Sequence, residues 1–177
     1  MTPLTDELLA EIRAEFPRFR IAKKRSSALQ RAIGVALRVV TAGRMKTYAT
    51  QYHTVLFGTL WVPDSWDAMS DVDRVILLRH ERVHLRQREA MGDALMAFVY
   101  LVPIFPVFLA YGRARIEWEA YEETIAATAE LLGVERARAL KPHIVRRFVG
   151  PDYGWMWPFP KTVSRWFDEA MERLPSS

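Results

Sequence analysis

Residues 80–84 of the chain read His-Glu-Arg-Val-His, an H-E-x-x-H motif. In a helix, His80 and His84 are one turn apart and lie on the same face, so both imidazoles can reach one ion. Glu81 lies about 100° further round the helix, where it would flank such an ion rather than bind it. A catalytic zinc typically has three protein ligands and a water, which Glu81 would deprotonate as general base. The motif therefore predicts two zinc ligands and a general base.

The sequence on the N-terminal side of the motif predicts a helix that carries it and strands before that helix. Ser70 is followed three residues later by Asp73, a helix-starting pattern, and we expect a helix from there to about residue 90. Residues 47–62 are rich in β-branched and aromatic side chains, which favours two short strands or a hairpin. Further helices are expected over residues 5–17 and 26–40.

Residues 94–111 carry no charge, and Pro103 and Pro106 interrupt them. Eighteen such residues are long enough to span a bilayer once. The prolines favour a bend instead, and a single crossing would separate the motif from the acidic residues that follow. We therefore expect a buried helix–turn–helix under the metal site, with a shallow dip into a membrane as the alternative.

Beyond this stretch, the helical pattern continues to about residue 132. A short helix broken by Pro142 should follow, and a last amphipathic helix should cover about residues 161–174. The predicted fold is a mostly helical α+β single domain over residues 1–177, with a small sheet before the motif helix. Its expected regions are an N-terminal helical part (1–45), the sheet and metal-site helices (46–132), and a C-terminal helical part (133–177).

Composition excludes several classes of protein. Of the 177 residues, 50% are hydrophobic and 26% are charged, which does not fit a disordered chain. The absence of cysteine excludes thiolate metal sites and disulfides. A formal charge of +4 is too small to indicate a nucleic-acid partner, and none is expected. Acidic residues among the first 20 do not fit a secretory leader, so a cytoplasmic location is expected.

The most basic stretch, residues 18–25, has five Lys or Arg in eight positions. It is interpreted as a solvated connection between two helices, with contact to acidic lipid or nucleic acid as the alternative.

A third zinc ligand has to come from outside the motif. The remaining histidines, His53 and His143, have no useful spacing, whereas acids cluster over residues 117–123. This arrangement resembles the gluzincin zinc metallopeptidases, in which a second helix supplies a glutamate within an E-x-x-[AS]-[DN]-like pattern. Residues 117–121, Glu-Trp-Glu-Ala-Tyr, match that pattern through the alanine. The resemblance implies Glu117 as the third ligand, and Glu119 is the alternative.

The match ends at Tyr121, where gluzincins often have an aspartate that orients a ligand histidine. A metal-bound histidine normally donates its other N–H to an acceptor. Tyr121 is a candidate for that acceptor or for an oxyanion donor; alternatively Glu119 accepts the bond and Tyr121 is only packed. Tyr153 is a further candidate for stabilising the transition state.

Over about residues 54–168 the chain is similar to small bacterial zincin-like proteins of unknown activity. The segments that carry this similarity are His-Glu-Arg-Val-His-Leu-Arg-Gln (80–87), residues 117–121, and the late Tyr-Gly-Trp-Met-Trp-Pro-Phe (153–159). It implies a zincin-like fold in which residues 54–59 form either an edge strand able to bind extended peptide or an ordinary strand of the sheet.

The sequence thus predicts a Zn²⁺-dependent metallohydrolase, most simply a peptidase acting on peptide or protein. One alternative is a zincin-fold binding or regulatory module without turnover. A second is a membrane-surface protein that uses the basic residues 18–25 and the apolar stretch 94–111.

Overall fold

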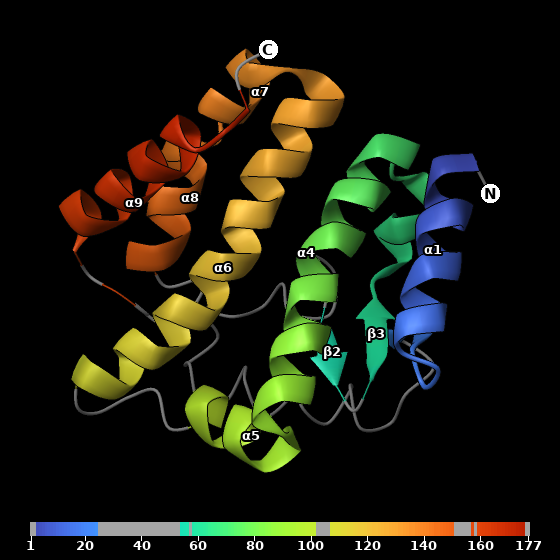
Figure 1. The fold of residues 1–177 in the computed structure, drawn as a ribbon. Helices are drawn as coiled ribbons and strands as arrows, with labels where there is room; N and C mark the ends of the chain where they lie inside the picture. Colours follow the sequence, from blue (N-terminus) through green and yellow to red (C-terminus); the bar gives the residue numbers. More distant parts are fainter. Residues whose placement is uncertain are drawn as a thin grey trace. The chain divides into compact units, whose positions relative to one another are not determined.

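The computed structural model describes residues 3–24, 54–56, 58–101, 107–150, 157 and 159–175. The contacts within the chain divide it into two compact units, residues 1–81 and 82–177. Helices make up most of the described part, and a small sheet precedes the helix that carries residues 80–84 (Figure 1). The prediction of a mostly helical α+β fold is confirmed, and the predicted division into three regions stays a prediction.

The described residues of the first unit form α1 (Pro3–Glu15), β1 (Arg20–Lys23), β2 (Thr54–Leu56), β3 (Thr59–Val62), the 3₁₀ helix η2 (Asp64–Ala68) and the first half of α4 (Asp71–Met91). The strands β1, β2 and β3 form a sheet in the order β1-β3-β2, with β2 antiparallel and β1 parallel to β3. Gly58, between β2 and β3, has a φ of 76°, which favours glycine. On β3, Leu60 and Val62 are buried and alternate with half-buried neighbours.

The hairpin expected within residues 47–62 is confirmed for β2 and β3, and residues 47–53 lie outside the described residues, as does the helix expected over 26–40. The interpretation of residues 18–25 as a solvated connection is wrong for its middle part. Arg20–Lys23 form β1, with Ile21 paired to Leu60 in the parallel register. The strand was missed because its partner is about 40 residues away in the sequence, and its own apolar content is low.

Capping contacts of neighbouring residues set both ends of helix α4. The hydroxyl of Ser70 accepts a hydrogen bond from the backbone N–H of Asp73 at 3.1 Å, which confirms the predicted start. Asp71, in the first turn, accepts hydrogen bonds from the backbone N–H (3.2 Å) and hydroxyl of Thr5 and so ties α1 to this helix end. After Met91, Gly92 has a φ of 79° and donates its N–H to the carbonyl of Arg88, a common helix stop.

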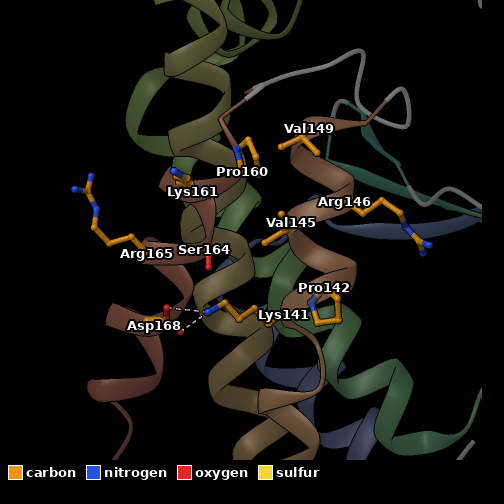
Figure 2. Close-up of a pocket in the computed structure, with 10 residues that line it drawn as sticks. All are labelled: Lys141, Pro142, Val145, Arg146, Val149, Pro160, Lys161, Ser164, Arg165 and Asp168. Carbon is orange, nitrogen blue, oxygen red and sulfur yellow. Dashed lines mark hydrogen bonds and ion pairs between the residues drawn. The ribbon is translucent and has the colours of Figure 1, made fainter.

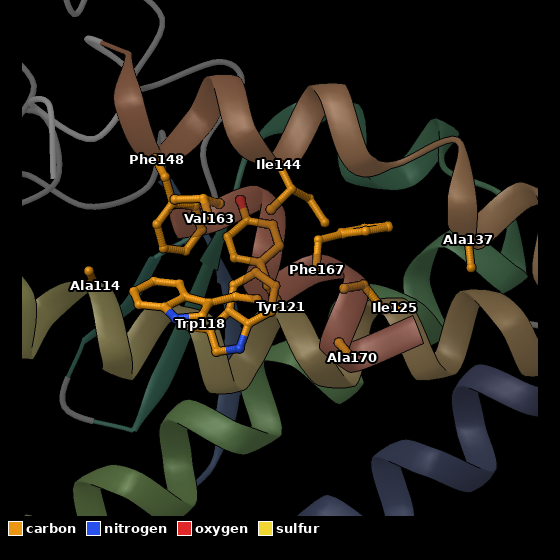
Figure 3. Close-up of a cluster of buried hydrophobic side chains, with 11 residues drawn as sticks. Ala114, Trp118, Tyr121, Ile125, Ala137, Ile144, Phe148, Val163, Phe167 and Ala170 are labelled. Carbon is orange, nitrogen blue, oxygen red and sulfur yellow. The ribbon is translucent and has the colours of Figure 1, made fainter. Parts of the chain in front are cut away.

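The second unit continues with α5 (Asp93–Leu101), α6 (Val107–Leu132), α7 (Val134–Arg138), α8 (Lys141–Val149) and α9 (Pro160–Glu172). Its core lies where α6 packs against α8 and α9 (Figure 3). The rings of Trp118 on α6 and Trp166 on α9 have centroids 5.5 Å apart, and the ring of Phe148 on α8 lies 6.0 Å from Trp118. These aromatic contacts fix α6, which also carries the acidic residues of interest.

The long helix α6 ends at the predicted place, because Gly133 takes a φ of 92°. The expectation that Pro142 breaks a helix is wrong: Pro142 lies in the first turn of α8, where its missing N–H costs nothing. The predicted last helix is confirmed as α9.

The apolar stretch 94–111 is helical on both sides of residues 102–106, which lie outside the described residues. Helices α5 and α6 are in contact, as a helix–turn–helix requires. The expected burial is wrong for the described ends of the stretch, because Leu95 and Tyr111 are exposed. Within the described part of the chain, none of the helices has the length and apolar character needed to cross a membrane.

Candidate metal centre

Two of the predicted ligands share one face of α4. Because α4 is a continuous helix over Asp71–Met91, His80 and His84 are separated by one turn. The side chain of His84 is buried, and that of His80 is half-buried. Glu81, the predicted general base, has an exposed fraction of only 7%.

The third predicted ligand, Glu117, lies on α6 with an exposed fraction of 3%. Its Oε2 is 3.9 Å from Nε2 of His84. One nitrogen each of His80 and His84 and a carboxylate oxygen of Glu117 all lie within 4.8 Å of one another. The structure therefore brings together the three side chains that sequence reasoning had named as ligands.

The chemistry of this donor set fits zinc, which is bound in proteins by imidazole nitrogen and carboxylate oxygen. Bond lengths of about 2.0–2.2 Å place the ligand atoms of a tetrahedral zinc about 3.4 Å apart. The 3.9 Å between His84 and Glu117 is close to this spacing. A bound metal ion would also offset part of the free-energy cost of burying the carboxylate of Glu117.

The acceptor for the other nitrogen of His84 is one that sequence reasoning missed. Nδ1 of His84 lies 2.9 Å from Oε1 of Gln87. Nε2 of Gln87 donates to the backbone carbonyl of Ile116 at 3.0 Å and to Oε2 of Glu119 at 2.7 Å. Gln87 lies three residues after His84, so the helical i, i+3 spacing was an available signal.

The candidates for supporting roles are placed differently. Glu119 has an exposed side chain and reaches His84 only through Gln87. Tyr121 is buried in the core of the second unit, with its ring centroid 5.4 Å from that of Phe148 and its hydroxyl among side chains of α8 and α9 (Figure 3). Tyr153 lies outside the described residues. The chemical roles expected of these three residues stay predictions.

A buried lysine in the first unit was also missed. Lys24 directly follows β1 and has an exposed fraction of 3%. Burial lowers the pKa of Lys24 to about 8, and the negative charge of Glu81 partly opposes this shift. Sequence reasoning had placed Lys24 in a solvated stretch, so its closeness to Glu81 follows only from the unpredicted strand β1.

A separate groove of about 880 Å³ lies between α8 and α9 (Figure 2). Its lining is apolar at Val145 and Pro142. Its cationic residues are Lys141, Arg146, Lys161 and Arg165. The ammonium of Lys141 is held by both carboxylate oxygens of Asp168, at 2.7 and 2.8 Å. Of the residues that were predicted for the metal centre and that the structure describes, none lines this groove.

Comparisons with protein families, with curated proteins and with solved structures give no match to this chain.

Proposed function

We propose that the chain is a zinc-dependent metallohydrolase of gluzincin type, and that it acts as a peptidase. The observation that carries this proposal is the convergence of His80, His84 and Glu117, whose ligand atoms lie within 4.8 Å of one another. Two imidazoles and a carboxylate leave a fourth position for water on a tetrahedral ion, which is the ligand pattern of catalytic rather than structural zinc sites.

Zinc bound by these residues would lower the pKa of its water and polarise the substrate carbonyl. Glu81 follows His80 directly and would take the proton of that water as its oxygen attacks the peptide carbonyl carbon. As the C–N bond breaks, the same carboxyl group would deliver the proton to the leaving amine. Burial of Glu81 suits this role, because a water-poor surrounding strengthens its electrostatic interactions with the reacting groups.

The test combines metal analysis with the variant Glu81→Gln. The wild-type protein is expected to contain about one zinc per chain and to cleave a fluorogenic peptide library. Glu81→Gln should keep the zinc and lose turnover by about 10²–10⁴-fold, because it removes the general base and not a ligand. Glu89→Gln, an exposed change two turns later on the same helix, is the matched control.

A wild-type protein that binds zinc but cleaves no member of the library would point to the alternative, a binding module without turnover. Equal turnover in wild type and Glu81→Gln would remove Glu81 from the mechanism.

The proposal includes a cytoplasmic location, with peripheral membrane contact through residues 18–25. Arg18 and Arg20 have exposed side chains, which supports such contact, whereas Lys23 is paired with Asp67 at 2.7 Å. Cell fractionation and flotation with anionic liposomes test both statements, and liposome binding of this kind should weaken as salt is raised.

A further inference from the structure

The side-chain amide of Gln87 has both of its ends occupied, which fixes its orientation. Its NH₂ group has two protons, and two acceptors face it: the carbonyl of Ile116 at 3.0 Å and Oε2 of Glu119 at 2.7 Å. A flipped amide would point its oxygen at these two acceptors. Oε1 of Gln87 is therefore the atom that faces His84.

This orientation determines which nitrogen of His84 carries the proton. Because Oε1 of Gln87 can only accept, Nδ1 of His84 must donate to it across the 2.9 Å between them. In a neutral imidazole, the lone pair is then on Nε2. Nε2 is also the atom that faces Oε2 of Glu117 at 3.9 Å, and two electron-rich atoms at this distance favour a cation between them.

We propose that Gln87, held in place by Glu119, is a positioning residue that fixes His84 in the tautomer and ring orientation needed to bind the metal through Nε2. This inference rests on the proposed function. It assigns to Glu119 a role other than the two considered from the sequence, which were metal ligand and direct acceptor of the histidine N–H. Glu119 instead accepts a hydrogen bond from Gln87 and so holds that acceptor in place.

All of the groups in this arrangement belong to the second unit, where α4 and α6 each contribute part of it. Gln87 and His84 come from α4, and Ile116, Glu117 and Glu119 come from α6. The hydrogen bonds of Gln87 thus also join the ligand on one helix to the backbone next to the ligand on the other. Loss of Gln87 should loosen both the ring of His84 and its spacing to Glu117.

The first test measures zinc affinity by competition with a chromophoric chelator. Loss of an acceptor behind a metal-bound histidine typically weakens metal binding about 10–100-fold, and we expect a loss of this size for Gln87→Ala. Glu119→Ala should weaken zinc binding less than tenfold, because Glu119 is exposed and the carbonyl of Ile116 still accepts one hydrogen bond from the amide of Gln87. The control Glu89→Ala, an exposed change on α4, should leave the affinity unchanged.

A charge exchange tests the direction of the hydrogen bonds. Gln87→Glu keeps an acceptor for His84 but turns a carboxylate oxygen towards Glu119, so it should weaken zinc binding on its own. Adding Glu119→Gln supplies an amide donor from the other side and should recover much of the lost affinity. If Gln87 acted through packing alone, adding Glu119→Gln should recover no zinc affinity, because glutamine and glutamate at position 87 have nearly the same volume.

The second test uses the metal-free protein and therefore does not depend on zinc. In long-range ¹H–¹⁵N NMR spectra, the neutral imidazole of His84 should carry its proton on Nδ1 in the wild type, and Gln87→Ala should shift population to the Nε2–H form. NMR also provides a folding control. A variant that loses zinc affinity because it misfolds is recognised by the reduced dispersion of its amide signals.

The outcomes separate this inference from the proposed function. If wild type binds no zinc, the proposed function fails, and the positioning role fails with it. If wild type binds zinc, while Gln87→Ala and Gln87→Glu bind it equally tightly with an unchanged tautomer of His84, only the positioning role is overturned.

Discussion

Zinc should stabilise the folded chain, and Glu117→Gln should remove most of that stabilisation. The three proposed ligand side chains meet only in the folded state, because Glu117 lies on a different helix from the histidines. Zinc should therefore bind the folded protein far more tightly than the unfolded one. At a free zinc concentration of 100 times Kd, the free energy of unfolding increases by about 2.7 kcal/mol. For a chain of this size, 1 kcal/mol corresponds to about 2–4 °C, so Tm should rise by about 5–11 °C.

The variant keeps the volume of the side chain but replaces a charged ligand by a neutral amide. A loss of about 100-fold in zinc affinity would reduce the stabilisation at the same zinc concentration to about 0.4 kcal/mol, or a shift of at most about 2 °C. Thermal unfolding followed by circular dichroism, with and without zinc, measures both shifts. Glu130→Gln, an exposed change on the same helix, is the matched control and should keep the full increase. An equal increase in Glu117→Gln and wild type would refute the assignment of Glu117 as a ligand.

Three further changes test the packing and the electrostatics of the two units. Phe148→Ala should lower the free energy of unfolding by about 3–5 kcal/mol in guanidinium titrations, because it removes a fully buried ring from the core of the second unit; a loss under 1 kcal/mol would contradict this packing. Lys24→Met should flatten the pH dependence of stability. Burial lowers the pKa of Lys24 from 10.5 to about 8, so unfolding takes up a proton between these values and the wild-type free energy of unfolding rises with pH there. Urea titrations at pH 7, 8.5 and 10 measure this difference, and parallel curves for the two proteins would argue against the buried position. Ser70→Ala should cost about 1 kcal/mol in thermal unfolding through loss of the cap on α4, and an unchanged Tm would show that the hydroxyl does not cap the helix.

Features that depend on neighbouring residues could be predicted from the sequence. The start of α4 follows from Ser70 and Asp73, and the end of α6 follows from Gly133, because caps and stops act within one turn. The alignment of His80 and His84 on one face follows from helical periodicity alone. Pro142 shows how such local signals can be misinterpreted, since proline interrupts a helix interior but is well tolerated in a first turn.

Features that depend on distant residues could not be derived in this way. The strand β1 forms because it pairs with β3, and the sequence of residues 20–23 does not indicate that partner. The position of Glu117 beside His84 was implied by a family resemblance rather than by spacing. The amide of Gln87 finds its two acceptors on α6, 29 and 32 residues further along the chain, so its role required the structure.

The groove between α8 and α9 affects how any lipid-binding experiment is interpreted. Arg146, Lys161 and Arg165 are exposed cationic side chains along this groove, so at low ionic strength they should attract acidic vesicles even where residues 18–25 take no part. Flotation should therefore be repeated with Arg146→Gln and Lys161→Gln combined. Only vesicle binding that remains in this double variant can be assigned to residues 18–25.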